Sequence, residues 1–102
     1  HSLTSDEIWY YHLGSSIKIY LLDKKGVLSQ EILGPNIDQG ESLSVLIPAG
    51  VIFGAELLDK EGFGLVSCIV SPGFRFEDFK LYTEDELLSR YPEHSQIIKK
   101  LT

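Results

Sequence analysis

Short apolar runs separated by turn-forming residues dominate roughly the first eighty positions of the chain. Each run is rich in Ile, Val, Leu, Phe and Tyr and has the length of an ordinary strand. The pattern predicts six strands, at residues 7–13, 17–22, 27–33, 43–47, 51–58 and 64–70. Closely spaced strands of this kind are typical of a sandwich or a barrel.

Alternation and turn chemistry sharpen this prediction. In the second run, Ile17, Ile19 and Leu21 share one face, so the intervening residues share the other. Residues 23–26 read Asp-Lys-Lys-Gly, which suits a hairpin with glycine in a left-handed position, and residues 59–62 repeat the arrangement as Asp-Lys-Glu-Gly. We therefore expect antiparallel neighbours with one face of the sheet buried.

The last twenty or so residues change character and predict a helical tail over 83–101. Thr83 and Glu86 form a capping box, in which the threonine hydroxyl accepts the amide three residues later. Pro92 suits the first turn of a new helix better than the interior of a continuing one. That second helix carries an apolar stripe formed by Ile97, Ile98 and Leu101. We expect two short helices packed on the outside of the β structure.

Several residues with chemical potential are interpreted as structural. Phe74, Phe76 and Phe79 predict a packing ribbon laid over the core, and an aromatic platform for a ligand is the other interpretation. Cys68 lies within an apolar run and is interpreted as a small buried hydrophobe. His94, beside a glutamate in the tail, is interpreted as solvated.

Composition limits the protein class. The 102 residues make one domain, with 43% apolar and 24% charged residues, as in an ordinary globular protein. Nine Lys and Arg against fifteen Asp and Glu give a charge of −6, which repels nucleic acid and anionic membrane surfaces as partners. The single cysteine cannot form an internal disulfide, which favours a reducing compartment, and we expect a cytoplasmic protein.

Several motifs occur together in one order along nearly the whole chain. Ser-Asp-Glu-Ile-Trp stands at 5–9, and the others are Pro-Ala-Gly at 48–50, Phe-Gly-Ala at 53–55, Pro-Gly-Phe at 72–74, Phe-Glu-Asp-Phe at 76–79, Pro-Glu-His at 92–94 and Leu-Thr at 101–102. With these motifs the chain resembles the cupin superfamily, and most closely a branch of unknown function. The resemblance implies an all-β fold, a double-stranded β-helix (jelly-roll) barrel with one or two short C-terminal helices, in a single domain over 1–102.

The resemblance also implies a homodimer, because related cupins commonly pair through their sheets. Relatives carry further strands before the position of His1, which help to close the barrel and line its cavity. We expect those N-terminal strands to be missing from this sequence.

The metal-binding motifs of cupins are only partly present. Their first motif has two histidines, a glutamate and a later glycine, and here His1, Glu7 and Gly14 match while Leu3 replaces the second histidine. The other motif leads into a histidine whose place is taken by Phe53. Two donors cannot hold a transition metal tightly against water. We expect neither a firmly bound metal nor a cofactor.

What remains of the motif predicts a pocket for a small molecule. If Glu7 faces inward, period-two alternation turns two aromatic residues of the same strand inward and His12 outward. The predicted ligand-binding residues are His1, Glu7, Trp9, Tyr11 and Phe53. Such a pocket is mostly apolar, with one carboxylate and one imidazole to orient a ligand.

Three functions fit this pocket. The first is binding of a small polar metabolite in the barrel cavity, without established catalysis. The second, by analogy with cupin-fold deoxysugar epimerases, is a metal-independent isomerase or epimerase acting on a sugar nucleotide, with His1 and Glu7 as proton carriers. The third is a dimerisation unit without a ligand, in which His1 and Glu7 merely satisfy each other.

Overall fold

The computed structural model describes all residues, 1–102. Its strands are β1 (Ser2–Leu3), β2 (Asp6–Gly14), β3 (Ile17–Leu22), β4 (Leu28–Leu33), β5 (Ser44–Ile47), β6 (Ile52–Leu57), β7 (Gly64–Ser71) and β8 (Phe79–Lys80). Three-residue 3-10 helices lie at η1 (Ile37–Gln39), η2 (Phe76–Asp78) and η3 (Pro92–His94), and two α-helices follow at α1 (Glu84–Arg90) and α2 (Ser95–Leu101). The six predicted strands are confirmed as β2 to β7.

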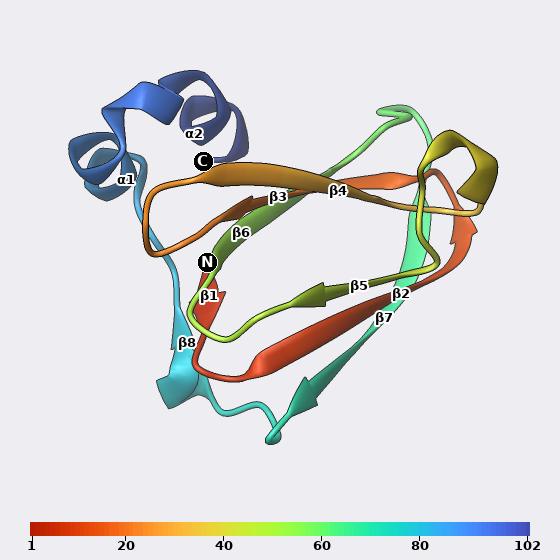
Figure 1. Cartoon of the computed structure of the whole chain (residues 1–102), viewed down its shortest axis with the longest axis horizontal. Helices are drawn as coiled ribbons and strands as arrows, with labels where there is room; N and C mark the ends of the chain where they lie inside the picture. The colour runs from red at the N-terminus through yellow and green to blue at the C-terminus, as the bar shows by residue number, and fades with distance from the viewer.

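Two antiparallel three-stranded sheets form the body of the protein. One has the order β5-β2-β7 and the other β4-β3-β6, and Figure 1 shows them as two facing layers. The two shortest strands, β1 and β8, pair with each other at one end. The layers are joined on one side by a bridge between Leu33, at the end of β4, and Ser42, just before β5. The all-β jelly-roll expectation is confirmed at this level.

The core lies between the layers. Ile17, Ile19 and Leu21 point into it from β3, as their alternation predicts, and Ile19 is fully buried. The facing sheet contributes Val45 and Ile47 from β5. Because β3 pairs with β4 on one side and β6 on the other, its main chain is fully bonded in the ladder, and it forms the centre of its sheet.

The two layers are not closed into a barrel, which corrects the prediction. Strand β7 pairs only with β2, so its other edge is open. The prediction of a buried Cys68 is wrong for the same reason: the residue lies on β7 and is exposed. Alternation determines which face a side chain occupies, but another element must cover that face to bury it.

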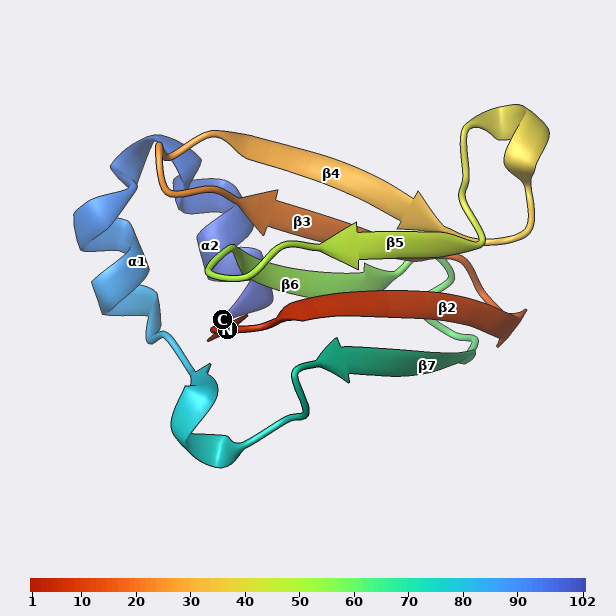
Figure 2. The ribbon, with the colours of Figure 1, turned by 60° about the horizontal axis from the view of Figure 1, so that its bottom comes forward.

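The C-terminal helices pack against the outer face of β4-β3-β6 (Figure 2). The predicted capping box is present, since the Thr83 hydroxyl accepts the amide of Glu86 at 3.2 Å. Pro92 opens η3 and thereby separates the two α-helices. A second cluster of buried residues joins sheet and helices, and it consists of Leu22, Ile52, Leu87, Tyr91 and Ile98. None of the helices is long and apolar enough to cross a lipid bilayer.

The aromatic ribbon does not cover the core as predicted. Phe74, Phe76 and Phe79 are 47%, 85% and 36% exposed. Their rings pack on one another instead, with centroids 5.2 Å apart for Phe74 and Phe76 and 6.3 Å apart for Phe74 and Phe79. The segment after β7 crosses one end of the two layers to reach β8 beside β1 (Figure 1).

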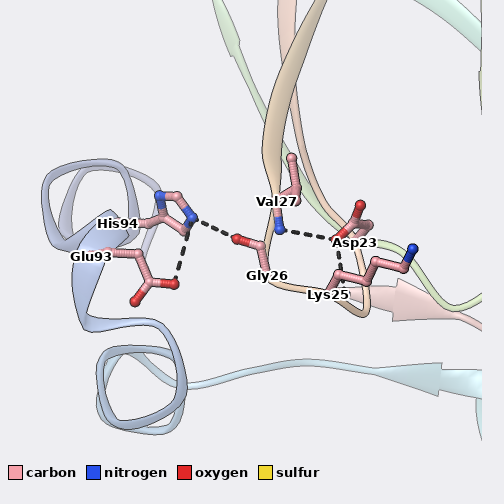
Figure 3. A network of polar contacts seen from close by, with 6 residues as sticks. All are labelled: Asp23, Lys25, Gly26, Val27, Glu93 and His94. Atoms are coloured by element: carbon pink, nitrogen blue, oxygen red, sulfur yellow. Dashed lines mark hydrogen bonds and ion pairs between the residues drawn. The ribbon is translucent and has the colours of Figure 1, made fainter.

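His94 is not solvated, contrary to the prediction. Its Nε2 lies 2.8 Å from the carbonyl oxygen of Gly26, in the hairpin between β3 and β4 (Figure 3). The hairpin is fixed by Asp23, whose Oδ1 accepts the amides of Lys25 and Val27 at 2.9 Å each. Gly26 adopts the predicted left-handed conformation with φ of 82°.

The second predicted hairpin glycine behaves differently. Gly62 is absent from the positive-φ glycines, although its amide does donate to the carbonyl of Asp59 at 3.1 Å. The two Asp-containing turns therefore share the aspartate contact and not the glycine conformation.

Candidate functional site

Strand β2 places Glu7 and Trp9 on the inner face, opposite the core residues Ile47 and Val45 of β5. The indole Nε1 of Trp9 donates to Oε1 of Glu7 at 2.9 Å. Glu7 is only 7% exposed, and its other oxygen, Oε2, is buried without a hydrogen-bond partner. An unpaired buried acceptor of this kind lowers the stability of the fold by about 1–3 kcal/mol. Oε2 of Glu7 is the buried side-chain polar atom that has no hydrogen-bond partner.

Phe53 lies between His1 and Trp9. The main chains of His1 and Phe53 exchange two hydrogen bonds, of 3.0 Å and 2.8 Å, which hold the residue before β1 against β6. Their rings are in contact, with centroids 4.2 Å apart. The Trp9 ring meets Phe53 edge-on at 6.1 Å, and Phe79 lies 5.1 Å from His1 on its other side. These rings form one aromatic group beside Glu7.

The structure does not join His1 to Glu7. No ion pair links the two side chains, because His1 packs among aromatic rings while Glu7 is bonded to Trp9. Tyr11 lies further along β2 and donates its hydroxyl to the carbonyl of Gly14 at 2.9 Å, in an exposed contact. Of the five predicted residues, four are therefore linked through ring contacts and one hydrogen bond, and Tyr11 stands apart.

His12 lies on the opposite face of β2, as alternation predicts. Its imidazole is 2.8 Å from the hydroxyl of Ser67, which pairs with the outward-facing Tyr10. A register irregularity between Tyr11 and Leu13 places His12 at a bulge without returning it to the interior. It takes no part in the interior site.

Cys68 belongs to the site but was not recognised from the sequence. It pairs with Trp9 across the β2–β7 ladder and so lies on the inner face near Glu7. Partial burial, then the negative charge of the neighbouring Glu7 and the contact of the thiol with its carboxylate, raise the pKa of the Cys68 thiol to about 11. The cysteine is therefore a neutral thiol near neutral pH. Cys68 lies near Glu7 only because of the register in which β7 pairs with β2. An apolar run in the sequence does not indicate that register.

The sizeable cavity in the structure lies elsewhere. It has a volume of about 420 Å³, and His1 and Phe53 line it while Glu7, Trp9 and Tyr11 do not. Its remaining walls come from the C-terminal helices, the segment 81–83 that precedes them, and the outer face of β4-β3-β6. Two rings of the interior aromatic group therefore border this cavity, but the carboxylate of Glu7 does not reach it.

Comparison with known proteins identifies the family. The model of a family described as "Cupin superfamily (DUF985)" matches residues 1–82. The chain belongs to this cupin family. No curated protein sequence matches it.

Two solved structures resemble this cupin closely. The crystal structure of protein SO0799 from Shewanella oneidensis is 44% identical with a TM-score of 0.95, and covers 99% of this chain. A hypothetical protein from Leishmania major is 33% identical with a TM-score of 0.88, also over 99% of the chain. This chain spans only 63% and 66% of those two proteins, respectively.

The donor set of this cupin does not fit a resident metal. No three His, Cys, Asp or Glu side chains gather closely enough to hold an ion. The two positions where cupin motifs have further histidines carry Leu3 and Phe53, which are 6% and 4% exposed and pack in the protein interior. Apolar side chains at these places supply packing contacts and no ligand atoms.

Proposed function

We propose that this cupin binds a small polar metabolite at the interior site formed by Glu7, Trp9, Phe53 and His1. The observation that carries the proposal is the buried Oε2 of Glu7, which has no partner while Oε1 is bonded to Trp9. A ligand that donates a hydrogen bond to Oε2 removes the cost of the unpaired acceptor. An ionised carboxylate oxygen only accepts, so the complementary group is a hydroxyl or an amine.

The surrounding rings define the rest of the ligand. Trp9, Phe53 and His1 offer aromatic surface, which packs against the apolar face of a sugar or a heterocycle. Cys68, which pairs with Trp9 across the β2–β7 ladder, is exposed, so this side of the site borders solvent. A single acceptor among aromatic walls matches the usual design of ligand sites.

The test compares wild-type protein with Glu7→Gln by saturation-transfer NMR, using glucose, glucosamine and uridine diphosphate glucose as probes. The amide keeps the shape of the carboxylate but replaces one acceptor oxygen with a donor. We expect at least one probe to bind and to lose about tenfold in affinity or more in the variant. Glu31→Gln, on the exposed part of β4, is the matched control. Unchanged affinity in Glu7→Gln, or binding of none of the probes, would contradict the proposal.

A metal-independent isomerase remains the second candidate, with His1 and Glu7 as proton carriers on a sugar nucleotide. It has less support, because the two side chains are separated by the aromatic group and do not polarise each other. This function requires that Glu7→Gln abolish turnover of a sugar nucleotide. Turnover is measured as exchange of a substrate proton with deuterated solvent. Loss of binding without any exchange in the wild type supports the binding function instead.

We also propose that the protein is a homodimer. The outer face of β5-β2-β7 exposes Leu46 and Ile69, each 55% exposed, on the two strands that flank Ile8. The free edge of β7 offers unpaired main-chain groups beside this apolar surface. A second copy of the same surface is self-complementary across a two-fold axis.

A further inference from the structure

We infer that the cavity between the β4-β3-β6 sheet and the C-terminal helices is a second binding site, for a small molecule with an apolar body and a neutral or cationic polar end. The cavity shares His1 and Phe53 with the interior site, but Glu7 and Trp9 do not line it, and the inference does not rest on the function proposed above. Its volume of about 420 Å³ falls within the range of about 300–1,000 Å³ typical of ligand sites.

The cavity has an apolar floor and an apolar roof. Leu22, Ile52 and Gly54 line it from the sheet, and Leu87 and Ile98 line it from the helices. Four of these five belong to the buried cluster that joins the sheet to the tail. The walls are thus part of the packed structure, and a ligand would meet a preformed surface.

Gly54 lets helix α2 lie close to the floor of the cavity. It faces outward on β6, between the inward Phe53 and Ala55, and pairs with Tyr20 of β3. A Cβ atom placed on Gly54 would lie only 3.2 Å from Cδ1 of Leu101 in α2. Any larger side chain here would occupy the space between sheet and helix. A side chain at residue 54 would therefore displace Leu101, which also lines the cavity.

The roof is held by a polar contact as well as by packing. His94, which lines the cavity, is tied through Nε2 to the carbonyl oxygen of Gly26 at 2.8 Å (Figure 3). This contact joins η3 to the β3–β4 hairpin, 68 residues away in the sequence. It fixes the helical tail over the sheet at the point where the chain turns from α1 to α2.

The charge of the lining selects against anions. The side chains of the lining include one carboxylate, that of Glu84, and no Lys or Arg. Of the nearby basic residues, Lys100 is engaged by Glu56 at 3.0 Å, and Lys80 lies over the ring of Tyr82 at 4.7 Å. The other basic groups of the lining are engaged as well: the N-terminal ammonium of His1 donates to the carbonyl of Phe53 at 3.0 Å, and the imidazole of His94 is bonded to Gly26. A negatively charged end beside Glu84 would therefore have no uncommitted cation next to it. An uncharged or cationic end near Glu84 suits the site.

Three probes with the same alkyl chain test the inference: octylammonium, octanol and octanoate, titrated by isothermal calorimetry below their micelle concentrations. We expect octylammonium and octanol to bind, and octanoate to bind at least about tenfold more weakly. Gly54→Val should weaken both binders by about tenfold or more by filling the floor. Gly73→Val is the matched control, because a Cβ on Gly73 meets no atom within 4 Å. Equal binding by Gly54→Val and wild type, or equal binding of octanoate, overturns the inference.

Two further variants keep the test decisive. If circular dichroism shows that Gly54→Val is unfolded, Ile97→Trp fills the same cavity from the half-buried side of α2. Glu84→Gln should weaken octylammonium by several-fold and leave octanol unchanged, whereas Asp85→Asn, its neighbour outside the lining, should change neither. Glu7→Gln should bind both probes as wild type does, so failure of this site and failure of the interior site are separate results.

Discussion

The thiol of Cys68 provides a direct probe of the interior site. Its pKa is raised from the ordinary value of 9.0 to about 11, first by partial burial and then by the charge of Glu7. Because Cys68 is exposed, access of a reagent does not limit its reaction. The rate of alkylation by iodoacetamide therefore reports the fraction of thiolate directly.

The expected magnitude follows from the pKa. A rise from 9.0 to about 11 lowers the thiolate fraction at pH 8 by about 100-fold. A thiolate of higher pKa is intrinsically more nucleophilic, with a Brønsted coefficient of about 0.4–0.5. This effect raises the alkylation rate by about six- to tenfold and so offsets part of the loss. We therefore expect folded protein to react roughly ten- to twentyfold more slowly than the same chain unfolded in urea.

The assay is the pH dependence of the alkylation rate from pH 7 to pH 12, followed by intact mass. The midpoint should lie near 11 in folded protein and near 9.0 in urea. Glu7→Gln removes the charge and changes the contact between this side chain and the thiol, while the partial burial remains, so its midpoint should fall part of the way. A folded midpoint near 9.0, or no change in Glu7→Gln, would refute the placement of Cys68 beside Glu7.

The same pKa shift predicts a pH dependence of stability. Between pH 9 and about 11 the unfolded chain loses the Cys68 proton while the folded chain retains it. The stability from this group is present below pH 9 and is lost as the pH rises through that window. The thermal midpoint of wild type should thus fall more steeply there than that of Cys68→Ser; parallel curves would contradict this.

Three further predictions concern the fold and the assembly. Leu33→Ala, at a fully buried position, should lower the unfolding free energy by about 2–5 kcal/mol in urea, whereas Leu65→Ala, 54% exposed, should change it by no more than about 0.5 kcal/mol. The hydrogen bond from the Ser16 hydroxyl, 2.6 Å long, is the main cause that lowers the pKa of Glu41 below 4.5, so wild type should lose thermal stability below that pH and Glu41→Gln should lose less. Light scattering should give a dimer mass for wild type and a monomer mass for Leu46→Lys; a monomeric wild type refutes the dimer.

Much of the fold could be predicted because strand signals are local. The alternation of Ile17, Ile19 and Leu21 and the aspartate-glycine turn that follows them lie within ten residues of one another, and the structure confirms both. The capping of α1 by Thr83 is equally local. Such features depend on backbone chemistry that neighbouring residues determine.

The errors share a different physical origin. Cys68 and Phe76 were expected to be buried, yet nothing packs over the edge that exposes them. His94 was expected in solvent, yet it reaches a carbonyl of a distant hairpin. Burial and long-range contacts depend on which elements pack over a surface. The alternation of apolar residues predicts which face of a strand is apolar, but it does not predict which element packs on that face. The separation of His1 from Glu7 has the same cause.

Strand β6 has a thermodynamic consequence because it forms a partition between two sites. Phe53 faces the interior group and the next residue, Gly54, faces the cavity under the helices. If both sites bind ligands, a displacement of this strand by one ligand changes the affinity for the other. Linkage then requires that the effect be equal in both directions: whatever factor octylammonium imposes on the interior ligand, that ligand must impose on octylammonium.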